Sequence, residues 1–152
     1  MSDPITFTSA SARYALPLLF AGQTQKEFFV NEAHALTDAL LHPAIEGEAD
    51  APPATPANGE TWLVGDAPTG AWADHAGCLA SYQADTWVFA VPRDGMRVLD
   101  RAAGQDICFR GGWQRAVTPA VPSGGTTVDG EARTAIAGLV AALVAGGILA
   151  AS

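Results

Sequence analysis

Residues 77–92 read GCLASYQADTWVFAVP, and residues 104–119 read GQDICFRGGWQRAVTP. Each stretch contains a glycine, a β-prone run ending in an aromatic residue, a tight turn, a tryptophan and a second β-prone run. This order predicts two related hairpins. An aromatic pair is expected to face across each turn, Tyr82 with Trp87 and Phe109 with Trp113. One hairpin alone buries little surface, so the hairpins are expected to combine into a small meander or barrel.

The hairpins lie within a longer β-rich stretch, residues 59–117, which we predict to be an antiparallel β-hairpin domain. Six short β-prone runs, separated by Gly, Asp, Pro and Ala turns, are its expected strands: Thr61–Val64, Cys78–Tyr82, Thr86–Val91, Met96–Leu99, Ile107–Arg110 and Trp113–Val117. Residues 44–58 and 118–129 are rich in Pro, Gly and Ala, a composition that predicts linkers.

A helix is predicted before this domain, over residues 22–43. Thr24 and Glu27 are spaced as a capping box, and Pro43 ends the helical pattern. Four apolar residues recur at helical spacing and predict the packed stripe, namely Phe29, Ala33, Leu36 and Leu40. Residues 1–21 are expected to form an extended arm, because Pro4, Pro17 and the Ser, Thr and Ala mixture disfavour a helix.

A second helix is predicted over residues 130–152, with Asp129 as its N-cap and Gly146-Gly147 as a Schellman-type stop. No side chain from Thr134 to Ala151 is charged. A helix that is apolar nearly all round must be buried, and a short chain has little with which to bury it. The expected solution is self-association through a seam formed by Ile136, Leu139, Val140 and Leu143. The fold class expected for the whole chain is α+β.

Composition limits the range of functions. The 152 residues carry 16 acidic and 8 basic side chains, a formal net charge of −8. That balance argues against a nucleic-acid ligand. Only 16% of residues are charged, which suggests that subunit contacts cover much of the surface. The N-terminal stretch has no long apolar segment typical of a signal peptide, and residues 135–151 are marginal in length for a membrane span.

No residue pattern points to catalysis or a cofactor. The histidines, His34, His42 and His75, have no second ligand at metal spacing. Cys78 and Cys108 are expected to be partly buried thiols in a reducing compartment, with one inter-strand bridge as the alternative. The carboxylates fall in a linker or at turns, where turn chemistry explains them, so glycan hydrolysis is a minor alternative. No catalytic residue, metal or cofactor is assigned.

The tryptophans of the β-rich stretch are the stronger candidates for binding. The favoured interpretation places them in the hairpin core. The alternative is that some of them stack on sugar rings, since indole has a large apolar face and a polar edge. The candidates for glycan stacking are Trp62, Trp72, Trp87 and Trp113.

Residues 14–41, YALPLLFAGQTQKEFFVNEAHALTDALL, resemble the LPLLxAGQAQKExxxNEAL signature of a phage protein family. Two later phrases of that family are also similar, GETWLVGDAPTGAWADHAGC at residues 59–78 and WVFAVPRDGMRVL at residues 87–99. The resemblance covers about residues 13–116. The family is a domain of unknown function found in tail-fibre and spike proteins of tailed phages and gene-transfer agents. Residues 131–149 look like the helices that close many short phage fibre proteins.

The sequence departs from the family pattern at several positions. Thr24 replaces the usual Ala, His34 and Thr37 replace leucines, and Gly138 stands where Asn is usual. The histidine and threonine weaken the apolar packing expected of the first helix. The family has no assigned catalytic residues, so none is transferred.

The resemblance implies a virion structural protein, a homotrimeric fibre or spike subunit that attaches a particle to a host cell without chemistry. The implied partners are further copies of the chain, other virion proteins at the tail hub, baseplate or capsid, and a cell-surface polysaccharide. Assembly would take place in the bacterial cytoplasm, and no membrane span is implied. The three-fold number comes from the resemblance alone. The alternatives are a small carbohydrate-binding module using the hairpin tryptophans, and an enzyme acting on capsule or cell-wall glycan.

Overall fold

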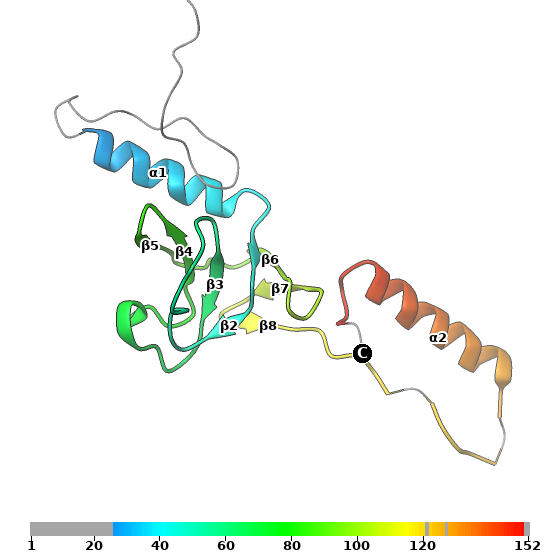
Figure 1. The fold of residues 1–152 in the computed structure, drawn as a ribbon. Coiled ribbons are helices and arrows are strands. Elements are labelled where there is room, and N and C mark those ends of the chain that lie inside the picture. The colour runs from blue at the N-terminus through cyan, green and yellow to red at the C-terminus, as the bar shows by residue number, and fades with distance from the viewer. Residues whose placement is uncertain (1–25, 121, 127, 151–152) are drawn as a thin grey trace, which may run out of the picture. The chain divides into compact units, whose positions relative to one another are not determined.

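The computed structural model describes residues 26–120, 122–126 and 128–150, with the backbone alone for residues 26–29. It confirms the α+β class, with two helices and two small sheets (Figure 1). The elements are α1 (Lys26–Leu40), β1 (Ala44–Ile45), β2 (Glu48–Ala49), β3 (Thr61–Val64), the 3-10 turn η1 (Gly70–Trp72), β4 (Leu79–Gln83), β5 (Thr86–Ala90), β6 (Arg97–Asp100), β7 (Gln105–Phe109), β8 (Trp113–Gln114) and α2 (Gly130–Ala145). They fall into two compact units, Met1–Pro92 and Arg93–Ser152. The expected arm and the capping threonine lie outside the described residues.

The prediction that residues 44–58 form a linker is wrong for their first half. β2 pairs in parallel with β3, with Glu48 opposite Leu63. The Glu46 N–H donates to the Thr61 carbonyl over 2.8 Å, and the Leu63 N–H donates to the Gly47 carbonyl over 3.0 Å. These bonds satisfy backbone groups along β3 that would otherwise be a bare sheet edge. The two strands within residues 44–58, β1 and β2, are each only two residues long, which is too short to give a sequence period.

The first unit holds a sheet in the order β2-β3-β4-β5. Its β4–β5 hairpin confirms the first predicted aromatic pair: Tyr82 lies opposite Trp87, and their ring centroids are 4.9 Å apart. The two-residue turn is Ala84-Asp85, and both residues have positive φ, 50° and 60°. A turn of this kind matches the twist of the strands that it joins. The pattern of residues 77–92 therefore predicted this hairpin correctly.

Trp72 forms the centre of the first unit. It is fully buried, packs with Val64 and Ala80, and meets Trp87 edge to face with ring centroids 5.1 Å apart. The short η1 turn that carries it follows from Thr69, whose N–H and hydroxyl both donate to the Asp50 carbonyl. The largest buried side chain of the unit is thus fixed by a loop rather than by a strand.

Helix α1 packs against β4 and β5 (Figure 1). The predicted stripe does not describe its packed face: Ala33 and Leu40 are exposed and Leu36 is half-buried, while Asp38 and Ala39 are buried. The side chain of Phe29, the fourth stripe residue, lies outside the description. Short side chains allow close approach of a helix to a sheet, and Ala39 supplies one. The packed face is therefore rotated away from the leucines, which remain partly uncovered.

In the second unit β6, β7 and β8 are neighbours in that order. Phe109 lies opposite Trp113 with ring centroids 5.3 Å apart, which confirms the second predicted pair. Burial alternates along the strands, as expected when one face of a sheet meets the core. The buried side chains belong to Val98, Asp100, Gln105 and Ile107, whereas the residues between them in β6 and β7 are exposed or half-buried. This alternation shows that Val98 and Ile107 lie on the inner face of the sheet, and that Arg97 and Asp106 lie on its outer face.

Helix α2 has the two caps that the sequence predicts, and it ends at Ala145 rather than running through residues 130–152. The Asp129 carboxylate accepts the Ala132 N–H over 2.9 Å. At the other end Ile148 N–H donates to the Leu143 carbonyl and Gly147 N–H to the Val144 carbonyl, the bond pattern of a Schellman motif. No helix in the described part of the chain is long and apolar enough to cross a membrane.

The residues after α2 return to the sheet. The Asp106 N–H donates to the Gly147 carbonyl over 2.6 Å. The side-chain amide of Gln105, which is buried, donates to the carbonyls of Ala116 and Ile148 over 3.1 and 3.4 Å. Leu149 is buried as well. These contacts attach the C-terminal end of α2 to β7.

Gly147 adopts φ 70°, a region that costs an L-residue about 1 kcal/mol. We therefore expect Gly147→Ala to speed hydrogen exchange of the Ile148 and Leu149 amides by about five-fold. Gly146 has φ −82°, so Gly146→Ala is the matched control and should leave these amides unchanged. Equal exchange in the two variants would show that the left-handed glycine does not hold the helix end.

Candidate functional site

The four tryptophans proposed to stack on sugars do not share one exposed surface. Trp72 is fully buried, so its assignment as a stacking residue is wrong. Trp62 and Trp87 are half-buried and pack against the Trp72 cluster. Trp113 is half-buried beside Phe109, on the sheet face that also carries Ile107. The core interpretation of the tryptophans therefore accounts for most of their surface.

The predicted seam on α2 is largely exposed within its own chain. Ile136 is 41% exposed, Leu139 65% and Leu143 38%, while Val140 is half-buried. No residue of α2 is buried. The structure therefore places all four residues along one helix that its own unit leaves uncovered.

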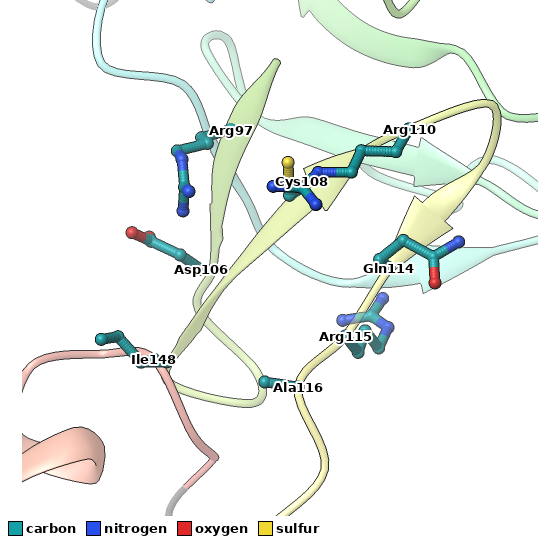
Figure 2. Close-up of a pocket in the computed structure, with 8 residues that line it drawn as sticks. All are labelled: Arg97, Asp106, Cys108, Arg110, Gln114, Arg115, Ala116 and Ile148. Atoms are coloured by element: carbon teal, nitrogen blue, oxygen red, sulfur yellow. The ribbon is translucent and has the colours of Figure 1, made fainter. Parts of the chain in front are cut away.

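A pocket that the sequence analysis did not identify lies on the second unit, on the outer face of its sheet. Arg97, Cys108 and Gln114 are direct cross-strand neighbours, so their side chains project from the same face. Asp106 joins them two residues before Cys108, where the side-chain period returns to that face. Figure 2 shows these side chains around a cavity of about 440 Å³. The full lining is Arg97, Asp106, Cys108, Arg110, Gln114, Arg115, Ala116 and Ile148.

The pocket concentrates positive charge in an acidic chain. Arg97, Arg110 and Arg115 are three of only eight basic residues. Arg115 forms an ion pair with the buried carboxylate of Asp100, which also accepts the Ala103 N–H over 3.1 Å. Among the described residues, neither Arg97 nor Arg110 forms an ion pair. Two guanidinium groups are thus left to face solvent beside the cavity.

Sequence reasoning missed this pocket because its residues are scattered along the chain between Arg97 and Ile148. Alternation gives only a weak signal here. The outward-facing positions include the apolar Leu99, while the buried positions include the polar Asp100 and Gln105. Ile148, which forms one side of the pocket, lies in the turn after α2, and no sequence pattern around it indicates a pocket.

Both cysteines are free thiols, so the inter-strand bridge does not form. Cys78 is buried, and burial raises the pKa of its thiol. Cys108 is half-buried and lines the pocket. Since the thiolate is the reactive form, the two side chains should differ in reactivity.

We expect iodoacetamide to alkylate Cys108 well before Cys78 in the native protein, with peptide mapping to identify the site. Because the pKa of Cys78 is raised, its alkylation should need a higher pH than an ordinary thiol, even after allowing for access. Urea should abolish the difference. Equal native rates would contradict the burial assigned to Cys78.

Several acidic side chains have structural roles at turns. Asp50 accepts the Ala67 N–H over 3.1 Å, and Asp94 accepts the Gly111 N–H over 2.7 Å. His75 stacks on Phe89, with ring centroids 3.6 Å apart. In the part of the chain that the structure describes, no three His, Cys, Asp or Glu side chains gather as a metal site would require.

Comparison with known proteins identifies a family for most of the described chain. The model of a family described as "Protein of unknown function (DUF2793)" matches residues 30–114. This range includes α1 from Val30 onward and every strand that the structure describes. No curated protein and no solved structure matches the chain.

Proposed function

The chain belongs to the DUF2793 family, and we propose that it is an oligomeric structural subunit of a phage-like particle, a fibre or spike that attaches the particle to a host cell. In this proposal the protein acts by adsorption and performs no chemistry. The similarity of residues 14–41 and 131–149 to phage sequences supports the assignment to a virion.

The uncovered apolar face of α2 is the observation that carries this proposal. Monomeric proteins rarely expose contiguous apolar patches beyond a few hundred Å². Here Ile136, Leu139 and Leu143 are all well exposed at helical spacing. The helix has its own N-cap and C-cap, so its length is fixed before assembly. It also has no charged residue after Arg133, which means that copies of it can pack without like-charge repulsion.

Further copies of the same chain are the proposed occupants of this face. Closed symmetry lets each helix cover the next, and a three-fold assembly is the number that the fibre-like sequence of residues 131–149 suggests. Small residues flank the seam, Ala135, Gly138 and Ala142, and they permit close approach of helix backbones. Leu40, the last residue of α1, and Leu41 after it are both exposed and offer further apolar surface for contact with other virion proteins.

Multivalency links assembly to attachment. Several weak contacts on one assembly give an overall affinity that can exceed a single contact by about 10²–10⁴-fold. A surface-binding subunit therefore gains from a dedicated oligomerisation helix.

The test compares adsorption to host bacterial cells of the unchanged chain and of Leu139→Glu, both labelled at the N-terminus. This variant leaves in place the residues after α2 that contact β7 and line the pocket. The unchanged chain should bind cells, and the variant should bind about 10²-fold more weakly. Circular dichroism checks that the variant keeps its helix and sheet content. Absence of cell binding by the unchanged chain, or equal binding by both chains, would contradict the proposal.

A further inference from the structure

We propose that the pocket on the outer face of β6, β7 and β8 binds a carboxylate-bearing sugar, such as a uronic acid residue of a surface polysaccharide. The argument starts from the two guanidinium groups of Arg97 and Arg110, which line the pocket without an ion pair to any described residue. A guanidinium group is planar and presents paired N–H donors that match the two oxygens of a carboxylate. The arrangement is seen in Figure 2.

The rest of the lining fits the hydroxyl and C–H groups of a sugar ring. Asp106 supplies carboxylate acceptors and Gln114 an amide that both donates and accepts. Ala116 and Ile148 supply apolar surface at the lower side of the view (Figure 2). The pocket, of about 440 Å³, is open to solvent, so a sugar bound there would keep part of its surface in water.

Charge argues for a ligand with one isolated anionic group. The chain has a net charge of −8, so a dense polyanion such as a nucleic acid is repelled at long range. Asp106 inside the lining adds to this repulsion at short range. Arg115 is already paired with Asp100, which leaves two guanidinium groups for one carboxylate.

The choice of a sugar over another carboxylate rests on the proposed role at a cell surface. The pocket requires no residue of the α2 seam. Pocket binding and assembly through α2 are therefore separable properties.

The test is calorimetric titration of the full chain with trisaccharides that each carry a single uronic acid residue, galacturonic, glucuronic or mannuronic, among neutral sugars. A neutral galactose trisaccharide and citrate serve as controls. At least one uronic trisaccharide should bind about ten-fold or more tightly than either control. The double variant Arg97→Gln with Arg110→Gln should lose this binding, while Arg93→Gln, an exposed arginine outside the lining, should retain it.

A second measurement uses the thiol inside the pocket. Saturating uronic trisaccharide should slow alkylation of Cys108 and leave that of Cys78 unchanged. Failure of every uronic trisaccharide to bind, citrate binding of equal strength, or equal loss in Arg93→Gln would overturn the proposal. The mass of the same samples in solution separates the two claims: a monomer that binds sugar removes only the proposed function, and an assembly that binds none removes only the pocket.

Discussion

Replacing Trp72 with alanine is expected to lower the free energy of unfolding by about 3–5 kcal/mol, the largest loss for any single change in the first unit. Trp72 is fully buried, and its ring contacts Trp87 edge to face. Removing the indole leaves a large cavity beside Val64 and Ala80 that the surrounding strands can fill only in part. Chemical denaturation followed by circular dichroism measures the loss.

Trp72→Phe is the matched variant. The indole Nε1 of Trp72 is buried and has no hydrogen-bond partner among the described residues. Phenylalanine keeps an aromatic ring and removes this unsatisfied donor, so the loss should be only about 1 kcal/mol. A loss as large as that of the alanine variant would mean that the N–H has a partner or that the ring is not at the centre of the core.

Replacing Leu139 with glutamate is expected to convert the assembly into single chains. Leu139 is the most exposed of the four seam residues, at 65%, so the change should not unfold a single chain. In the assembly, however, it would bury an unpaired charge in an apolar seam, which costs several kcal/mol. Light scattering after gel filtration measures the mass, and circular dichroism confirms that α2 remains folded.

Ala141→Glu provides the control for that variant. Ala141 is also exposed, and two residues of helix rotate its side chain to the opposite side of α2 from Leu139. It gains the same charge on the same helix and should keep the assembly intact. If both variants dissociate the assembly, the contact extends around the whole helix. If neither does, α2 is not part of the interface.

Features set by neighbouring residues were predictable from the sequence. The two hairpins follow from aromatic residues placed on either side of short turns, and the structure confirms the pairs Tyr82 with Trp87 and Phe109 with Trp113. The ends of α2 follow from Asp129 and the two glycines after Ala145, because caps depend on the local backbone. The family model matches residues 30–114, which are most of the residues 13–116 over which the sequence resembles a phage protein family.

Features set by distant contacts were not predictable in the same way. Strand β2 consists of Glu48 and Ala49, and its pairing depends on the exposed edge of β3 rather than on any period in its own residues. The buried face of α1 contains Asp38 and Ala39 rather than Leu40, so the leucine stripe predicted the wrong face of the helix. Trp72 is buried, as the favoured interpretation of the tryptophans predicts, but the loop that carries it has no period in its sequence that would indicate this burial.

The mass of the full chain in solution tests the central claim most directly. Native mass spectrometry and light scattering, both over a range of protein concentrations, should give three times the 15.6 kDa of one chain. A mass of 15.6 kDa at every concentration would contradict assembly through α2, and with it the proposed fibre or spike subunit.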